Sequence, residues 1–159
     1  MTTVALIMGH YTRTYELIQR LTDGITHADS MQQWDFAANN LNWLLGHVSV
    51  SRWNMLGMLG DKTSIWDFAQ AKRYIPGTAP IRSDETVTSF EALRAVFGRT
   101  QARLQVMLPQ QTPETLAMVR DGQTMGAILL YYAQHEAFHA GQIELCRGML
   151  GKASVTSFE

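Results

Sequence analysis

The sequence predicts an all-α fold, organised as a four-helix bundle. Four segments of about 20 to 27 residues carry apolar side chains at helical spacing, and a glycine or a proline follows each of them. About 27 residues separate the second segment from the third, which is enough chain to return along the length of a bundle. This length permits a long crossover that would make helices 2 and 3 parallel. A chance insertion in a simple up-down bundle fits the loop length almost as well.

The first two predicted helices have recognisable ends. "VALIMGHYTRTYELIQRLTDG" predicts a helix over about residues 3–23, which stops at Gly24 because glycine readily adopts the conformation that ends helices. "NNLNWLLGHVSVSRWNMLGMLG" predicts a second helix with Asn40 as its N-cap. This helix is expected to stop at Gly60.

The third and fourth predicted helices lie in the second half of the chain. "TSFEALRAVFGRTQARLQVMLP" predicts a helix over about residues 89–108, where Thr88 and Glu91 have the spacing of a capping box. "TMGAILLYYAQHEAFHAGQIELCRGMLG" predicts the longest helix, from an N-cap at Thr124 to a stop at Gly151.

Composition and charge limit the function classes. Hydrophobic residues make up 46% and charged residues 17% of the 159 residues, which is typical of a soluble globular protein, and the length fits a single domain over residues 1–159. The formal net charge is −1 and the 13 Lys and Arg residues are scattered, so we expect no nucleic-acid partner. The first apolar run, Val4 to Met8, is too short for a signal peptide or a membrane span. Because Cys146 is the only cysteine, we expect a cytoplasmic location.

The letters "HEAFH" at residues 135 to 139 spell the H-E-x-x-H signature of zinc proteases. In those enzymes two histidines one helical turn apart bind zinc, the glutamate activates water, and a third ligand follows further along the chain. Here residues 140–159 contain no further histidine, and no segment has the alternating pattern of a strand that could hold a peptide. We therefore expect a metal motif that is not a protease site, with no general-base role for Glu136.

Three histidines are the candidate metal ligands. His135 and His139 lie four residues apart, hence on one face of a helix, where both imidazoles can reach one ion. The best third ligand is His47, which shares an apolar helix face with Trp43 and Leu44. A neutral imidazole in a core needs a polar partner, and a shared metal ion would provide one. The alternative is that all three are core histidines with ordinary hydrogen bonds.

Taken together, "NNLNWLLGHVSVSRWNMLG" and "TMGAILLYYAQHEAFHAGQI" resemble the two signature helices of the DinB-like (YfiT-like) superfamily. The likeness lies in a polar cap, Asn40, seven residues before a histidine, and in the H-x-x-x-H-x-G-Q pattern near the end of the chain. It implies a DinB/YfiT-like bundle in up-down-down-up order, with a divalent metal, commonly zinc or nickel, held by His47, His135 and His139. Many members carry another histidine where this chain has Tyr131, so the role of that histidine is not carried over.

Characterised members of this superfamily include metal-dependent transferases and isomerases that use bacillithiol, mycothiol or glutathione. The resemblance therefore implies a transferase that uses a low-molecular-weight thiol and a small-molecule substrate, and it suggests a homodimer. Three neutral histidines would leave the ion its double positive charge and an open position, where a thiol or water would bind as an anion. Two alternatives remain: a metal-dependent hydrolase of a small substrate, and a metal-binding stress-response protein without turnover.

Four further residues are candidates for the lining of the site. Tyr131, Tyr132 and Gln142 fall on or beside the helix face that carries the two histidines, where they can orient a substrate or a bound water. Gln142 can also hydrogen-bond a ligand ring. The fourth candidate is His10, in the first predicted helix. The alternatives are core side chains with a polar tip for the first three and a partly exposed side chain for His10.

Overall fold

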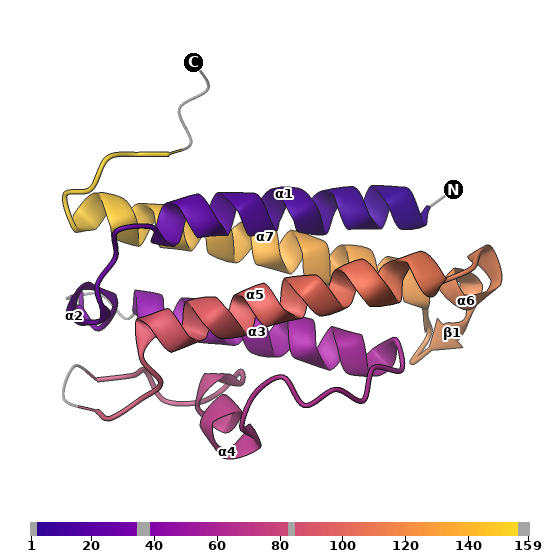
Figure 1. The fold of residues 1–159 in the computed structure, drawn as a ribbon, viewed down its shortest axis with the longest axis horizontal. Coiled ribbons are helices and arrows are strands. Elements are labelled where there is room, and N and C mark those ends of the chain that lie inside the picture. The colour runs from indigo at the N-terminus through magenta and orange to yellow at the C-terminus, as the bar shows by residue number, and fades with distance from the viewer. Residues whose placement is uncertain (1–2, 35–38, 83–84, 156–159) are drawn as a thin grey trace.

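Four long helices make up the bundle (Figure 1). The structure, a computed structural model, describes residues 3–34, 39–82 and 85–155. The long helices are α1 (Val4–Thr22), α3 (Leu41–Met58), α5 (Phe90–Met107) and α7 (Met125–Met149). The shorter elements are α2 (His27–Ser30), α4 (Phe68–Ala71), the 3₁₀ helices η1 (Lys72–Tyr74) and η2 (Leu108–Gln110), α6 (Pro113–Ala117), β1 (Val119–Arg120) and β2 (Gln123–Thr124). The predicted all-α class is confirmed.

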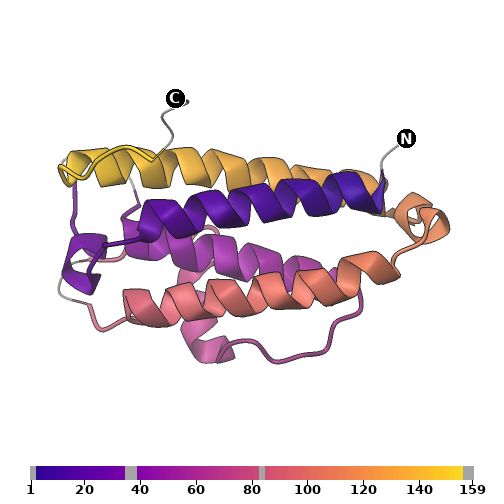
Figure 2. The same cartoon turned by 45° about the horizontal axis from the view of Figure 1, so that its top comes forward.

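The helix directions follow one pattern. Figure 1 shows that α1 and α7 run in one direction and that α3 and α5 run in the other. In Figure 2 the same helices form two layers, with α1 beside α7 and α3 beside α5, and α3 also contacts α7 across the layers. This view agrees with the predicted up-down-down-up order. The crossover between α3 and α5, which contains α4 and η1, passes along the outside of the bundle.

Two of the predicted N-caps are confirmed. The side chain of Asn40 accepts a hydrogen bond from the backbone N–H of Trp43 at 3.0 Å, and α3 begins at the next residue. Thr124 caps α7 in the same way, since its hydroxyl accepts from the N–H of Ala127 at 3.2 Å. Each cap satisfies a backbone N–H that has no partner within its helix.

The capping box predicted from Thr88 and Glu91 is wrong. The N-cap of α5 is Ser89, whose hydroxyl accepts from the N–H of Ala92 at 3.2 Å. Ser89 can take this place because a serine hydroxyl caps a helix as well as a threonine hydroxyl does. Thr88 lies one residue outside the helix, and its carbonyl oxygen accepts from the side chain of Asn42 at 3.0 Å.

A short hairpin leads into α7. Its strands β1 and β2 pair antiparallel, with Val119 opposite Thr124. The two turn residues, Asp121 and Gly122, both have positive φ angles, 49° and 80°, which is the conformation of tight two-residue hairpin turns. Strands of two residues are too short to show an alternating pattern, so the sequence does not predict them.

Helix α3 lies at the centre of the core. From Leu41 to Arg52 every side chain is buried, because α5, α7 and the crossover all pack against this helix. The polar side chains that α3 carries, His47 among them, are therefore held inside the protein. Among the described residues, no helix combines the length and the apolar character that crossing a membrane requires.

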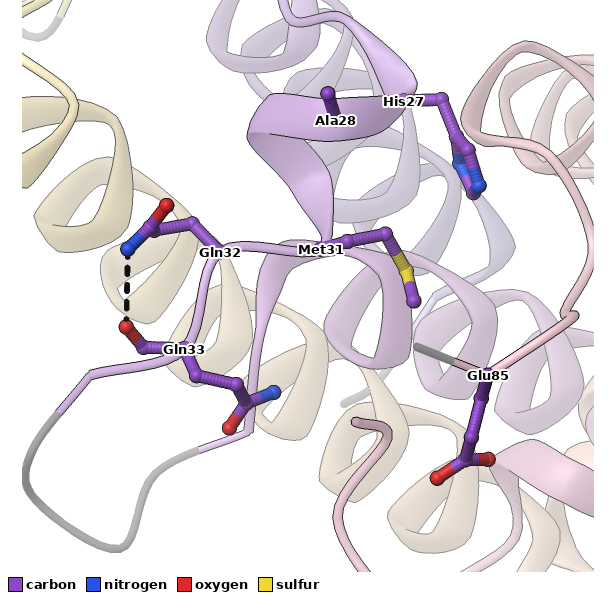
Figure 3. Close-up of a pocket in the computed structure, with 6 residues that line it drawn as sticks. All are labelled: His27, Ala28, Met31, Gln32, Gln33 and Glu85. Atoms are coloured by element: carbon purple, nitrogen blue, oxygen red, sulfur yellow. Dashed lines mark hydrogen bonds between the residues drawn. The ribbon is translucent and has the colours of Figure 1, made fainter. Parts of the chain in front are cut away.

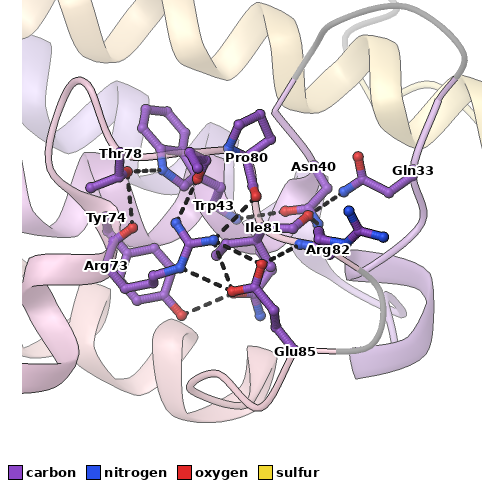
Figure 4. A network of polar contacts seen from close by, with 12 residues as sticks. Gln33, Asn40, Trp43, Arg73, Tyr74, Thr78, Pro80, Ile81, Arg82 and Glu85 are labelled. Atoms are coloured by element: carbon purple, nitrogen blue, oxygen red, sulfur yellow. Dashed lines mark hydrogen bonds and ion pairs between the residues drawn. The ribbon is translucent and has the colours of Figure 1, made fainter.

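Polar contacts brace the crossover (Figure 4). Arg73 forms an ion pair with Glu85, with 2.8 Å between Nη2 and Oε2, and it also donates to the carbonyl oxygen of Ala79 at 2.6 Å. The side chain of Asn40 donates to the carbonyl oxygen of Ile81 at 3.1 Å. The N-cap of α3 is thus also a point at which the crossover is attached to this helix.

Candidate metal centre

Three histidines from α3 and α7 meet at one point. His47 lies about two turns into α3, and His135 and His139 lie one turn apart on α7. The Nε2 atom of His135 is 3.1 Å from Nε2 of His47 and 3.0 Å from Nε2 of His139. One ligand atom from each histidine lies within 4.8 Å of those of the other two. The fold therefore brings together the three residues that the sequence singles out as ligands.

The other ring nitrogens show which atoms carry the protons. Nδ1 of His47 lies 2.8 Å from the carbonyl oxygen of Tyr74, and because a carbonyl oxygen only accepts, this Nδ1 donates. Nδ1 of His139 donates in the same way to Oε1 of Gln142 at 2.7 Å. A neutral imidazole has one proton, so the Nε2 atoms of His47 and His139 carry lone pairs directed toward His135.

This arrangement fits a divalent metal ion. Nitrogen lone pairs that converge at about 3 Å repel one another unless a cation or a proton lies between them. Imidazoles that bind metals usually donate their other N–H to a carbonyl or carboxylate oxygen, which is how His47 and His139 are held. Zinc and nickel both accept imidazole ligands, so the donor set does not choose between them.

His135 is the least constrained of the three ligands. Its Nδ1 atom is buried and has no hydrogen-bond partner among the described residues. Its ring lies beside two tyrosines, with ring centroids 6.4 Å away for Tyr131 and 6.3 Å away for Tyr132. Within the described residues neither tyrosine hydroxyl hydrogen-bonds this Nδ1, so the orientation of His135 depends on packing and on its contacts to His47 and His139.

Burial keeps the three histidines neutral. Desolvation is the largest cause of a lowered pKa at each of them, and the pKa of His139 falls to about 4. The hydrogen bond from His139 to Gln142 acts against this shift but does not cancel it. At neutral pH all three imidazoles are therefore uncharged, and neutral imidazole is the form that binds metals.

Aromatic rings enclose the ligands. Trp43 stacks on His47 with ring centroids 4.5 Å apart and an interplanar angle of 10°, and its Nε1 donates to Thr78 in the crossover at 3.1 Å. The ring of Phe138 lies 5.3 Å from that of His139, and this phenylalanine is 64% exposed. One side of the cluster is therefore closed by α3 and the crossover, whereas an exposed aromatic side chain flanks it on α7.

The four predicted lining residues have different positions. Gln142 contacts a ligand directly through Nδ1 of His139. Tyr132 is half-buried beside His135, and Tyr131 is 60% exposed on the same helix. His10 is exposed, and its carbonyl oxygen accepts from Thr14 at 3.0 Å. No described contact joins His10 to the three histidines, and its lining role stays a prediction.

Glu136 lies on the side of α7 that faces the core. It is 2% exposed, and its Oε2 atom accepts a hydrogen bond from Nε of Arg52 at 2.6 Å. Its Oε1 atom accepts from Nη2 of Arg52 at 2.6 Å and from the hydroxyl of Thr14. Because both of its oxygens accept hydrogen bonds from Arg52 or Thr14, the glutamate of "HEAFH" is held as the partner of a buried arginine.

Several residues that support the site cannot be recognised from the sequence pattern around the histidines. Arg52, a lone charge within the apolar stretch "VSVSRWNM", is a signal that a buried acidic partner exists elsewhere in the chain. Tyr74 and Thr78 belong to the crossover, which has no interpretable motif. A hydrogen bond to a backbone carbonyl oxygen, such as that of Tyr74, cannot be predicted from the residue type, because every residue has this group.

A separate surface pocket of about 510 Å³ lies beside α2 (Figure 3). It is lined by His27, Ala28, Met31, Gln32, Gln33 and Glu85. None of these residues belongs to the histidine cluster or to its predicted lining. The pocket is therefore distinct from the candidate metal centre.

The comparisons with known proteins concern the family and the fold. A profile of the DinB superfamily matches residues 10–143, a range that contains all three histidines. No curated protein matches the chain significantly. The crystal structure of a conserved protein from Enterococcus faecalis is similar to the whole fold, with a TM-score of 0.76, 18% identity and coverage of 96% of this chain and 99% of that one. At that identity the likeness concerns the fold alone. Because the profile covers most of the sequence, the chain belongs to the DinB superfamily.

Proposed function

We propose that this protein is a divalent-metal-dependent transferase that joins a low-molecular-weight thiol to an electrophilic small molecule. The observation that carries the proposal is the convergence of three neutral histidine nitrogens with no fourth ligand. Within the described residues, the cluster holds no Cys, Asp or Glu beside His47, His135 and His139. Structural zinc sites are closed by four protein ligands, whereas catalytic sites keep one position open. The three-ligand set therefore favours chemistry over a purely structural role.

A bound divalent ion would supply Lewis acidity, which lowers the pKa of a thiol or a water in the open position. The residues around it have separate tasks. Tyr74 and Gln142 hold the rings of His47 and His139 so that both Nε2 lone pairs face the centre. Tyr131 and Phe138 are exposed beside the ligands on α7 and offer apolar surface to an acceptor molecule.

The proposed reaction is a substitution at carbon. The thiol sulfur forms a bond to the electrophilic carbon, the leaving group departs with the electron pair of its bond, and the thiol proton passes to solvent. Glu136 is not the proposed acceptor of that proton, because both of its oxygens already accept hydrogen bonds from Arg52 or Thr14. The reaction is therefore expected to proceed without a protein general base.

The test uses the purified protein loaded with zinc or with nickel, a chromogenic aryl halide as electrophile, and a panel of bacillithiol, mycothiol and glutathione. Metal-dependent conjugation with one thiol, absent in the stripped protein and in His47→Ala, supports the transferase. Turnover with water alone points instead to the hydrolase alternative. Full metal occupancy without any turnover favours the metal-binding stress-response protein.

Two further predictions accompany this proposal. A transferase of small thiols would work in a reducing, cytoplasmic compartment, and the one cysteine, Cys146, is free and buried. The homodimer stays a prediction. Tyr131, Phe138 and Leu145 are exposed at seven-residue spacing, so one face of α7 carries apolar side chains next to the site.

A further inference from the structure

Tyr74 connects the crossover to the ligand helix at two points. It lies in η1 and is 1% exposed. Its carbonyl oxygen accepts from Nδ1 of His47 at 2.8 Å, and its hydroxyl donates to Oδ1 of Asn42 at 2.9 Å. Because Asn42 and His47 both belong to α3, the backbone and the side chain of Tyr74 are fixed to the same helix. The crossover segment cannot shift along α3 without breaking one of these bonds.

The ring of Tyr74 occupies the space that a side chain at position 46 would fill. A Cβ atom on Gly46 would lie 2.6 Å from Cγ of Tyr74 and closer still to two other ring atoms, whereas Cβ atoms essentially never come within 3.0 Å of a heavy atom. Gly57, on the same helix, has nothing within 4 Å of the corresponding position. Glycine weakens a helix interior, so its place directly before His47 calls for a local reason. The approach of Tyr74 to α3 is that reason.

The crossover also holds His47 on a second side. Trp43 stacks on the His47 ring, and its Nε1 donates to the hydroxyl of Thr78, four residues after Tyr74. Tyr74 itself packs against Trp66, with ring centroids 5.1 Å apart. The imidazole of His47 thus donates a hydrogen bond from Nδ1 to Tyr74 and stacks with one face on Trp43. Tyr74 belongs to the crossover, and Trp43 is hydrogen-bonded to it.

We propose that Gly46 and Tyr74 are positioning residues that set the orientation and the tautomer of His47, and through them the affinity for the metal ion. The inference rests on the proposed metal site. The crossover, which is remote in sequence from His135 and His139, then controls the third ligand. By linkage, an ion bound to His47 in turn favours the docked crossover over detached states.

The experiment measures Co²⁺ binding by the visible absorption of the bound ion and Zn²⁺ affinity by competition with a chromogenic chelator. Gly46→Ala is expected to weaken binding by about 10- to 100-fold, the usual range for loss of a group that orients a ligand. Gly57→Ala, the matched control, is expected to bind as the wild type does. Tyr74→Phe removes only the bond to Asn42 and is expected to weaken binding by about fivefold.

A double variant separates positioning from general damage. If the Tyr74 ring is the cause, Gly46→Ala adds little to the effect of Tyr74→Ala, because the space for the new methyl group is already open. Circular dichroism and thermal melting of the metal-free proteins show which variants are folded. A folded Gly46→Ala protein with wild-type affinity and an unchanged Co²⁺ spectrum would overturn the inference. If Gly46→Ala does not fold, wild-type affinity in Tyr74→Phe overturns it instead.

Failure of the metal site itself gives a different result. If the wild type binds no Co²⁺, or if His47→Ala binds it equally well, the proposed function fails at its first step. If binding depends on His47 but not on Gly46 or Tyr74, the metal site stands and the positioning role is refuted. A second readout is amide exchange in residues 72–82, which is expected to slow on Zn²⁺ binding in the wild type and to be unaffected in His47→Ala.

Discussion

Arg52 and Glu136 form a buried ion pair between α3 and α7, with 2.6 Å between Nε and Oε2. Their side chains are 1% and 3% exposed. Arg52 also donates to Oε1 of Gln101 at 2.7 Å, and its guanidinium lies 4.4 Å from the centre of the Phe97 ring. The pair therefore ties α3 and α7 together within the core, one residue away from the ligand His135.

Glu136→Gln is expected to lower the free energy of unfolding by about 3 kcal/mol, because it leaves the buried charge of Arg52 without its counter-ion. The metal affinity of the folded fraction should stay within about threefold of the wild type, since the described hydrogen bonds of Glu136 go to Arg52 and Thr14 and none goes to a histidine. Urea unfolding and Zn²⁺ competition measure the two quantities. Loss of metal binding in a fully folded Glu136→Gln protein would contradict this assignment.

Two variants act as controls for the ion pair. Glu16→Gln, at an exposed position on α1, should change the stability by less than about 0.5 kcal/mol. The double variant Arg52→Met with Glu136→Leu should recover much of the loss, since apolar residues can replace a buried pair with little cost. Any fall in activity of a Glu136 variant must therefore be corrected for its folded fraction before it is assigned to chemistry.

Metal removal is expected to lower the melting temperature without unfolding the chain at room temperature. At a free ion concentration of 100 times Kd, binding to the native state contributes about 2.7 kcal/mol, which corresponds to about 5 to 10 °C for a domain of this size. Differential scanning calorimetry with Zn²⁺ and with a chelator measures the shift. His135→Ala should show no such shift, and a wild type that melts at the same temperature in both conditions would rule out a tight site.

Gln142→Leu is expected to weaken Zn²⁺ binding by about 10- to 100-fold, because Nδ1 of His139 loses its acceptor and the ring can turn or change tautomer. Gln142→Glu keeps an acceptor oxygen and should restore most of the affinity. Competition with a chromogenic chelator measures both variants. Gln134→Leu, at an exposed position on the same helix, is the matched control. Equal affinities in the two leucine variants would refute the role of Gln142.

The ion pair between Asp61 and Arg103 predicts acid sensitivity. Hydrogen bonds from Arg103, with 2.8 Å between Nε and Oδ2, lower the pKa of Asp61 to about 2. In the unfolded chain this carboxyl has its ordinary pKa near 4, so its contribution is complete above that pH. The contribution is lost as the pH falls from about 4 to about 2, because the unfolded chain takes up the proton first.

Because the side chain of Arg103 is partly exposed, solvent screening keeps the contribution of this pair small. Asp61→Asn is therefore expected to be less stable than the wild type at pH 5 and nearly as stable at pH 2. Urea unfolding across this range measures the difference. Asp121→Asn, in the exposed turn of the hairpin, should keep the wild-type dependence on pH. A constant gap between wild type and Asp61→Asn from pH 5 to pH 2 would show that the carboxylate charge plays no part.

The features that local sequence determines could be predicted. Asn40 and Thr124 mark helix starts because a cap acts on an N–H only three residues away. His135 and His139 share a face because helical spacing is regular, and His47 stands out as a polar residue in an apolar helix. The capping box at Thr88 fails for a related reason, since two neighbouring hydroxyl residues compete for one place and Ser89 takes it.

The features that tertiary packing determines could not be predicted from the sequence. Nothing in the local sequence pairs Arg52 with Glu136, which are 84 residues apart. Tyr74 contacts His47 through its backbone carbonyl oxygen. Every residue type has this group, so the amino-acid sequence does not indicate the contact. The reason for Gly46 appears only when the crossover is seen lying against α3.

The Nε2 atom of His135 lies 3.1 Å from that of His47 and 3.0 Å from that of His139. All three candidate ligand atoms are imidazole nitrogens, a donor type that accepts several divalent ions. Such a site can exchange its metal with the surroundings. Nitrogen ligands bind nickel and copper more tightly than iron and manganese, whichever ion the protein uses in the cell. The ion found in a purified sample will accordingly reflect the ions present during expression, and the native metal has to be identified in protein isolated from its own cells.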